Sequence, residues 1–264
     1  MLNNKVRFEV LDSFRGIAAI CVAMSHMRYA GSVAELDFFR GGWVFVEFFF
    51  VLSGFVLTHG YAFRENLTFK QFAIPRTFRI LPLHIAMLFF VLVLEVGKLI
   101  ASQYGLNFNS GVFAGPTAIR EIIPNLFLLQ SWTDYTVLSF NIPSWSLSVE
   151  YYLYMLFFVT LFIKGGTRAL LWLGIVIIVA YLFLNNIALL TGSVERGLYS
   201  FFIGTLTYLV YSNMNNFIVK FPTYILTFFE LVCGILVFFI VALNLDSDKI
   251  TASLLFSFTI FVFS

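Results

Sequence analysis

Long apolar runs alternate with short polar connections along most of this chain. A membrane-spanning helix needs about 20 mostly apolar residues. We count about eight candidate spans, at Gly16–Met27, Gly41–Tyr61, Leu83–Ala101, Trp145–Ile163, Ala169–Leu184, Leu198–Tyr211, Tyr224–Leu243 and from Ile250 onward. The pattern predicts an all-α, polytopic transmembrane helix bundle that forms one membrane domain over residues 1–264. Because the last run is still apolar at Ser264, we expect the domain to be incomplete at its C-terminal end.

The composition supports this interpretation. Hydrophobic residues make up 60% of the chain and charged residues 11%, against roughly 45–50% and 25% in soluble domains. The formal net charge of +2 gives no reason to expect a nucleic-acid partner. The two cysteines, Cys21 and Cys233, each lie alone in an apolar run. We interpret both as packing residues and expect no metal site.

The basic residues indicate the orientation in the membrane. With the N-terminus in the cytoplasm, nine lysines and arginines fall in inner segments and six in outer segments, in the sense of the positive-inside rule. The inner set is Lys5, Arg7, Arg64, Lys70, Arg76, Arg79, Lys164, Arg168 and Lys220, and the outer set is Arg28, Arg40, Lys98, Arg120, Arg196 and Lys249. We therefore expect a cytoplasmic N-terminus.

Two ionisable residues, Arg15 and His26, lie in the first apolar run and its lead-in. They are eleven positions apart, so at about 100° and 1.5 Å per residue they share one helix face, roughly 16 Å apart along the axis. Ionisable groups at membrane depth cost roughly 2.5–3.5 kcal/mol each and usually mark a function. His26 is a candidate general base for a hydroxyl group, and Arg15 a candidate phosphate ligand at the inner leaflet. For either residue alone, snorkelling to lipid phosphates or a bond to a neighbouring helix explains it equally well.

A second basic cluster, Arg76 and Arg79 with Pro82, lies at the inner boundary of the third run. The i,i+3 spacing predicts that the two arginines lie on one side of a helix. Binding of a phosphate group and positive-inside anchoring account for the pair equally well. His84 follows the cluster, and we interpret it as a buried, hydrogen-bonded histidine.

A third cluster leads from the longest connection into the fourth run. Ser144 is a predicted N-cap, and Trp145 is a predicted interface residue. Glu150 lies six positions past the cap, inside the apolar run. It either orients an imidazole, binds a sugar hydroxyl, or satisfies the bundle as a paired or protonated carboxyl.

Two further features bear on substrate binding. Glu47 in the second span is a buried-carboxylate candidate of the same kind as Glu150, and Gly54 in the same run predicts a close approach between helices. The connection Ser102–Ser144 contains an amphipathic patch, Ile122–Trp132, that we expect at the outer membrane interface, where the connection would shape an acceptor site.

Together these motifs resemble the acyltransferase 3 family, polytopic membrane enzymes that O-acylate extracytoplasmic sugars and related molecules. The resemblance rests on four ordered segments, namely Leu11–Ala19 with His26, Phe49–Phe55, Arg76-x-x-Arg79 with Pro82, and Trp145–Glu150. Arg15 and His26 match the family's Arg-x10-His signature, and Arg76 and Arg79 match its second basic motif.

The resemblance implies an enzyme of the bacterial inner (plasma) membrane that transfers an acyl group, often acetyl, from cytoplasmic acyl-CoA to a saccharide or glycolipid of the cell envelope. The resemblance assigns donor binding to Arg15, Arg76 and Arg79, and catalysis to His26 and Glu150. Acceptor contact or structural support is assigned to Glu47, Ser144 and Trp145. His26 would act as a base or briefly carry the acyl group, and no bound cofactor is expected. The alternative is a transporter or exporter of an envelope precursor, which also lines its substrate path with charged residues.

Overall fold

The computed structural model describes residues 8–27, 29–133, 138–218, 221–243 and 249–264. Within these ranges all regular secondary structure is helical. The chain divides into two compact units: unit 1 comprises residues 1–64, 169–181 and 198–264, and unit 2 comprises residues 65–168 and 182–197. Some of the basic residues used to predict the orientation lie outside the described residues, namely Lys5, Arg7, Arg28 and Lys220.

The helices are distributed between the two units as follows. Unit 1 contains α1 (Glu9–Ser25), η1 (Val33–Glu35), α2 (Asp37–Arg40), η2 (Gly41–Val44), α3 (Phe45–Tyr61), α9 (Thr223–Ala242) and α10 (Lys249–Val262). Unit 2 contains α4 (Phe69–Gln103), η3 (Gly115–Thr117), η4 (Ile119–Glu121), α5 (Ile122–Leu126) and α6 (Ser144–Thr160). Two helices, α7 (Gly166–Leu184) and α8 (Gly192–Ile218), have residues in both units.

The predicted apolar runs are helical, but the prediction of about eight spans is too high. Among the described residues, four helices are long and apolar enough to cross a membrane, at Asp37–Tyr61, Phe69–Gln103, Gly166–Leu184 and Thr223–Ala242. Helices α1 and α6 have 17 residues each and α10 has 14, and at 1.5 Å per residue even 17 residues cover about 25 Å of a hydrocarbon core about 30 Å thick. Helix α8 has 27 residues, but polar side chains lower its mean hydropathy.

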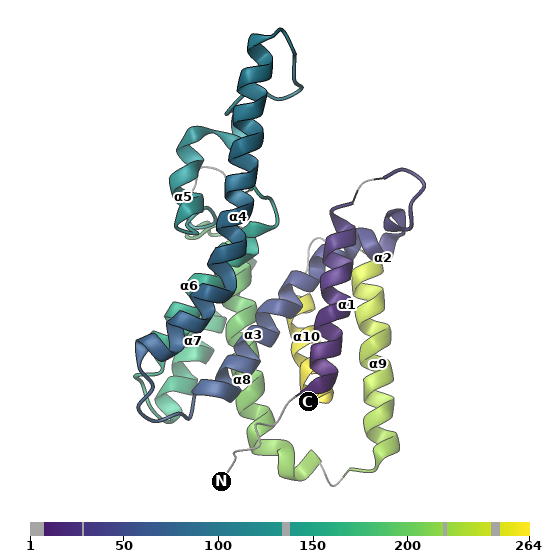
Figure 1. Ribbon diagram of the computed structural model, residues 1–264. Helices are drawn as coiled ribbons and strands as arrows, with labels where there is room; N and C mark the ends of the chain where they lie inside the picture. The colour runs from purple at the N-terminus through teal and green to yellow at the C-terminus, as the bar shows by residue number, and fades with distance from the viewer. Residues whose placement is uncertain (1–7, 28, 134–137, 219–220, 244–248) are drawn as a thin grey trace. The chain divides into compact units, whose positions relative to one another are not determined.

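Helix α3 is the buried centre of unit 1. Eleven of its 17 residues are buried, and α1 and α10 pack against it (Figure 1). It also crosses α8 closely, because a Cβ added at Gly54 would lie 2.0 Å from the carbonyl oxygen of Phe201, and one added at Gly204 would lie 1.9 Å from that of Val51. Only glycine permits such an approach between backbones. The prediction for Gly54 is therefore confirmed.

The polar side chains of α8 form a buried seam with α10 in unit 1. The hydroxyl oxygens of Ser200 and Ser253 lie 2.8 Å apart, and those of Thr207 and Ser257 lie 2.6 Å apart. Hydroxyl groups that bond across a helix pair satisfy each other in a medium without water. The same groups lower the hydropathy of α8, which explains why this helix falls short of a simple membrane-span pattern.

Unit 2 is organised around α4, one continuous helix of 35 residues. Thr68 caps its N-terminus in a reciprocal capping box with Gln71. One face of the helix is buried and carries Phe72, Ala73, Arg76, Ile80, His84, Leu88 and Glu95. Helices α6 and α5 pack against α4 (Figure 1). The buried face of α4 therefore includes charged and polar groups along with the apolar ones.

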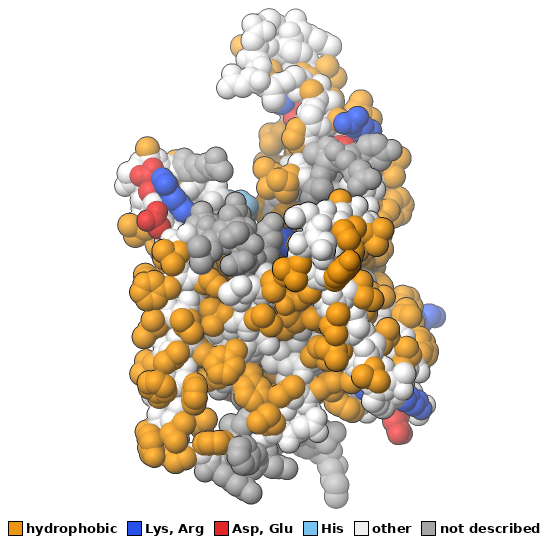
Figure 2. All heavy atoms as spheres, turned by 180° about the vertical axis from the view of Figure 1, so that it is seen from behind, with side chains coloured by type: hydrophobic (Ala, Val, Ile, Leu, Met, Phe, Trp, Pro, Cys, Tyr) orange, Lys and Arg blue, Asp and Glu red, His pale blue; other side chains and the backbone are white. Residues whose placement is uncertain are grey.

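The exposed surface of the long helices is apolar. Large hydrophobic side chains such as Phe89, Ile177 and Phe238 are at least half exposed, and only 22%, 22% and 11% of the span windows in α4, α7 and α9 are buried. On the face that Figure 2 shows, hydrophobic side chains predominate and charged ones gather in small clusters. Exposing such an apolar surface to water is unfavourable, whereas lipid tails can cover it. The chain is an integral membrane protein.

Candidate functional site

The predicted site residues fall in both units. Arg15, His26 and Glu47 belong to unit 1, whereas the remaining five belong to unit 2, namely Arg76, Arg79, Ser144, Trp145 and Glu150. The prediction that all of them form one catalytic site stays a prediction.

Helix α1 presents Arg15 and His26 differently from one another. Arg15 is half-buried in the middle of the helix, beside a buried stripe formed by Leu11, Ala18 and Cys21. His26 follows the last helical residue as the C-cap, and its side chain is exposed. The prediction that His26 lies inside the helix is therefore wrong by one position, because α1 ends at Ser25. The C-cap backbone is still right-handed helical, so the imidazole keeps roughly the face of Arg15.

Helix α3 carries one predicted group and one that the sequence did not single out. Glu47 is buried in the first turn, with 1% of its surface exposed. At the other end of the helix, His59 places Nδ1 3.0 Å from the hydroxyl of Tyr208, and Phe8 packs edge-on against its ring. A lone histidine near the end of an apolar run gives no spacing signal, so only the fold identifies its partners.

In unit 2 the structure brings Arg76 and Glu150 into one cluster. The guanidinium carbon of Arg76 lies 3.9 Å from the ring centroid of Phe72 and 5.6 Å from that of Tyr154. Its Nη1 donates to the carbonyl oxygen of Phe72 at 2.5 Å, and the hydroxyl of Tyr154 donates to Glu150. The two aromatic rings stabilise the cation through their π faces. Tyr154 thus links a predicted donor-binding residue to a predicted catalytic one.

The two arginines of α4 have different environments. Arg76 is 8% exposed, whereas the side chain of Arg79 is exposed. Between them, the hydroxyl of Thr77 lies 3.2 Å from that of Tyr151 and joins α4 to α6. Of the two arginines at i,i+3 spacing, one therefore occupies an interior position and the other a surface position. The exposed guanidinium of Arg79 offers its forked donors to an anion.

The start of α6 differs from the prediction. Ser144 is the first helical residue and Pro143 occupies the cap position, so the prediction of Ser144 as N-cap is wrong. Its hydroxyl donates backwards to the carbonyl oxygen of Asn141 at 2.6 Å and accepts from Nε2 of Gln130 at 3.2 Å. These bonds tie the helix start to the preceding loop. The neighbouring ring of Trp145 packs against Arg196, with the guanidinium carbon 4.9 Å from the ring centroid.

The patch Ile122–Trp132 is hydrogen-bonded to α6, and the expectation that it lies at the outer membrane interface stays a prediction. The hydroxyl of Ser148 donates to the carbonyl oxygen of Leu128 at 2.5 Å and accepts from the backbone N–H of Ser131 at 3.3 Å. The indole N–H of Trp132 donates to the carbonyl oxygen of Ser148 at 3.3 Å. Leu128 has a positive φ of 57°, which turns the chain so that these bonds form.

Buried acceptor atoms accumulate around this turn. His84 places Nε2 2.7 Å from the backbone oxygen of Asn125, which confirms the interpretation of a buried, hydrogen-bonded histidine. A carbonyl only accepts, so Nε2 carries a proton. Among the described residues, His84 Nδ1, Asn125 Oδ1, Gln130 Oε1 and the carboxylate oxygens of Glu121 have no hydrogen-bond partner, although Arg120 lies at ion-pair distance from Glu121. Burial also raises the pKa of the nearby Glu195 carboxyl at the start of α8.

These features agree with a family assignment. The family model described as an acyltransferase domain, Acyl_transf_3, matches residues 8–264, and the chain belongs to this family. Its members are enzymes that transfer acyl groups, and the resemblance found in the sequence motifs is confirmed.

Two named relatives are similar to part of the chain. It is 31% identical over 161 residues to "Acyltransferase MdmB" from Streptomyces mycarofaciens. This match covers 58% of this chain and 38% of the relative. It is 27% identical over 188 residues to "Peptidoglycan O-acetyltransferase OatA" from Listeria monocytogenes. This match covers 63% of this chain and 26% of the relative. The matched part thus spans less than half the length of either relative. No solved structure matches the chain.

Proposed function

We propose that this chain is a membrane-embedded O-acyltransferase that moves an acyl group, such as acetyl, from cytoplasmic acyl-CoA to a hydroxyl of an extracytoplasmic saccharide or glycolipid. The observation that carries the proposal is the placement of Arg15 in α1 and of His26 at the C-cap of the same helix, in a chain that belongs to the acyltransferase family. The name of the Listeria relative, a peptidoglycan O-acetyltransferase, supports an acetyl group and a saccharide acceptor.

The donor is bound through its phosphates. Arg15 is half-buried in α1 and Arg79 is exposed on α4, and a guanidinium group forms paired, charge-assisted hydrogen bonds to phosphate oxygens. Arg76 contributes positive charge from within the α4–α6 contact, where Phe72 and Tyr154 hold its side chain. The arginines bind and orient the donor and leave the chemical step to other groups.

His26 acts on the acceptor hydroxyl. Its imidazole takes the proton as the hydroxyl oxygen attacks the thioester carbonyl, the new C–O bond forms, and the C–S bond breaks. The coenzyme A thiolate leaves and recovers the proton from the imidazolium ion. Glu150, held by the hydroxyl of Tyr154, binds a sugar hydroxyl of the acceptor.

The proposal is tested with radiolabelled acetyl-CoA and envelope saccharide in membranes that contain the wild-type chain, the His26→Ala variant or the Met27→Ala variant. A general base contributes about 10²–10⁴ in rate, so His26→Ala should lose about a hundredfold or more of the transfer. Met27 is exposed beside His26, and Met27→Ala should keep the wild-type rate. Equal rates for all three chains overturn the role of His26. No transfer by well-inserted wild type contradicts the enzyme and favours the transporter.

A further inference from the structure

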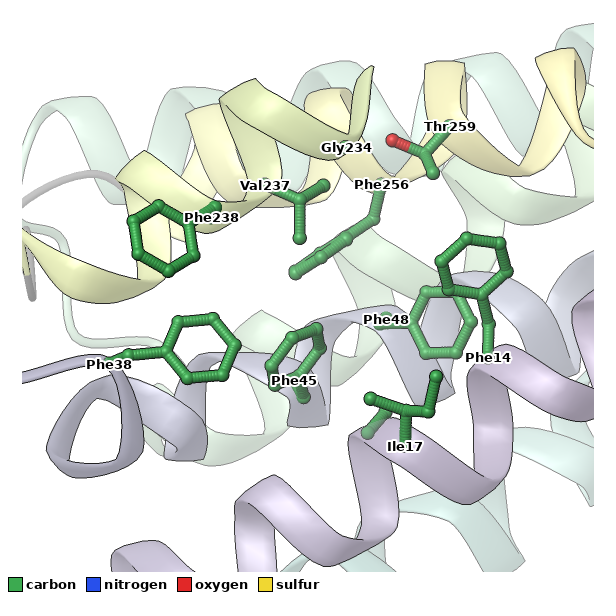
Figure 3. Close-up of a pocket in the computed structure, with 11 residues that line it drawn as sticks. Phe14, Ile17, Phe38, Phe45, Phe48, Gly234, Val237, Phe238, Phe256 and Thr259 are labelled. Carbon is green, nitrogen blue, oxygen red and sulfur yellow. The ribbon is translucent and has the colours of Figure 1, made fainter. Parts of the chain in front are cut away.

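Unit 1 contains a pocket of about 210 Å³ that is lined almost entirely by hydrocarbon. In Figure 3, Phe38, Phe45 and Phe48 stand on one side and Val237, Phe238 and Phe256 on the other, with Phe14 and Ile17 of α1 at one end. The complete lining is Phe14, Ile17, Ala18, Phe38, Phe45, Phe48, Gly234, Val237, Phe238, Phe256 and Thr259. These residues come from five helices of the same unit, α1, α2, α3, α9 and α10.

The lining determines what the pocket accepts. Thr259 is the polar exception, and its hydroxyl donates to the carbonyl oxygen of Leu255 in its own helix at 2.8 Å. The remaining lining offers neither charge nor side-chain hydrogen bonds, so a polar ligand would lose its water contacts without replacement. A hydrocarbon ligand has no hydrogen bonds to water that it would lose on entering the pocket. A dry cavity of about 150 Å³ already binds benzene, so this pocket has room for a chain of about six carbons, whereas an acetyl methyl would leave most of it empty.

The pocket adjoins the helix of the proposed donor and base residues. Phe14 precedes Arg15 in α1, and Ala18 lies one turn further along. His26 ends the same helix, about 12 Å beyond Ala18 along the axis. A hydrocarbon pocket on a helix that also carries a half-buried cation complements a molecule with an anionic head and an apolar tail.

We propose that this pocket receives the acyl chain of the donor, and that the preferred donor is an acyl-CoA with a chain of about six carbons. This inference rests on the proposed function, because the donor is the acyl-CoA of that reaction. The chain would lie among the phenylalanines while Arg15 contacts the phosphates. Each buried methylene adds to binding, so hexanoyl-CoA should show a KM about tenfold or more below that of acetyl-CoA.

Glycine positions provide a matched pair of variants. Gly234 lines the pocket, and a Cβ added there meets no other atom within 4 Å. Gly174 in α7 has equally open surroundings and does not line the pocket. Gly234→Leu therefore fills the pocket, and Gly174→Leu is the control for a leucine added to a membrane helix. Val237→Phe is a second filling variant from the same helix, should Gly234→Leu fail to fold.

The test measures KM for hexanoyl-CoA and acetyl-CoA in full-length wild type and both leucine variants. Gly234→Leu should raise the KM for hexanoyl-CoA by about tenfold and change that for acetyl-CoA by less than about twofold, and Gly174→Leu should change neither. An unchanged KM for hexanoyl-CoA in Gly234→Leu overturns the inference while leaving acyl transfer intact. If that variant instead loses a phospholipid that wild type retains in native mass spectrometry, the occupant is a lipid tail and the donor assignment is overturned.

Failure of the proposed function gives a different result. In that case wild type transfers neither acyl group, and equilibrium dialysis of hexanoyl-CoA against wild type and Gly234→Leu then tests the pocket alone. Weaker binding by Gly234→Leu supports the pocket. Equal binding by both chains overturns it.

Discussion

The two units of this protein bury different kinds of side chain. Of the six buried aspartate, glutamate, lysine and arginine side chains that the described residues contain, five belong to unit 2, and Glu47 belongs to unit 1. The five are Arg76, Glu95, Glu121, Arg168 and Glu195. Unit 1 instead contains close glycine contacts, a hydroxyl seam and a pocket lined mainly by hydrocarbon. Unit 1 thus has a mainly apolar interior, whereas most of the buried charged groups lie in unit 2.

The contrast also separates two ways of holding helices together in a membrane protein. In unit 1, Gly54 and Gly204 bring two backbones into contact, so the attraction is van der Waals packing. In unit 2, Arg76, Tyr154 and Ser148 join helices and loops through hydrogen bonds and a cation over aromatic rings. A close-packed contact between backbones is destabilised by any added side-chain volume. A polar contact is destabilised more by the loss of one hydrogen-bond partner than by added volume.

The largest expected effect of this difference is on Gly54. Gly54→Leu would force a side chain against the carbonyl oxygen of Phe201 and should cost about 3 kcal/mol or more of the free energy of unfolding. The control Gly174→Leu, in open surroundings, should stay within about 0.5 kcal/mol of wild type. Thermal unfolding in detergent measures both. Similar losses from the two variants would show that α3 and α8 do not touch as described.

The arginine pair should give the next largest effect. Arg76→Ala removes a cation from between two aromatic rings and should cost about 2 kcal/mol of the free energy of unfolding, whereas Arg79→Ala, at an exposed position, should cost less than about 0.5 kcal/mol. If both residues bind the donor, both variants raise its KM, and Arg79→Lys does so too because it loses the forked geometry. Equal stability of the two alanine variants would contradict the buried position of Arg76. An unaltered KM in Arg79→Lys would remove that residue from the donor site.

A smaller effect is expected at Tyr154. Tyr154→Phe removes the hydrogen bond to Glu150 and should cost about 1 kcal/mol of the free energy of unfolding, together with a lower kcat. Tyr152→Phe is the control, since its hydroxyl donates to the backbone oxygen of Phe127 at 2.8 Å. It should cost a similar amount of stability and leave kcat unchanged. Should both variants keep the wild-type kcat, Glu150 does not depend on Tyr154 for catalysis.

The smallest expected effect is a gain. Glu121 is fully buried, and its charged partner Arg120, 3.4 Å away, is 66% exposed. Glu121→Gln removes a buried charge and should raise the free energy of unfolding by about 0.5–1 kcal/mol. The control Glu35→Gln removes an exposed partner of Arg40 and should change it by less than about 0.5 kcal/mol. A loss of stability in Glu121→Gln would show that the carboxylate is well paired.

Much of the fold follows from local sequence patterns. The apolar runs predict the helices, and the position of Gly54 in a crowded run predicts a close approach between helices, whereas only the structure identifies α8 as the partner. Span lengths do not follow in the same way, because α1 ends at Ser25 although the apolar run continues to Met27. Helix ends depend on capping and tertiary contacts that hydropathy does not record.

The site is less predictable than the fold. Motif spacing identifies Arg76 and Glu150, but the ring of Tyr154 that connects them depends on how α4 packs against α6, two helices far apart in sequence. The turn at Leu128 is harder still, because a leucine with positive φ is disfavoured locally and is stabilised by Ser148. Buried hydrogen bonds across long sequence distances override local preferences.

Sealed proteoliposomes provide the most direct test of the central claim, which is acyl transfer across the membrane. Radiolabelled acyl-CoA is added outside vesicles that enclose the saccharide acceptor, with wild type or His26→Ala in the membrane. Wild type should label the enclosed saccharide, and His26→Ala should give about a hundredfold less label. Label that appears only in saccharide added to the donor's side, or in no saccharide, would contradict the central claim.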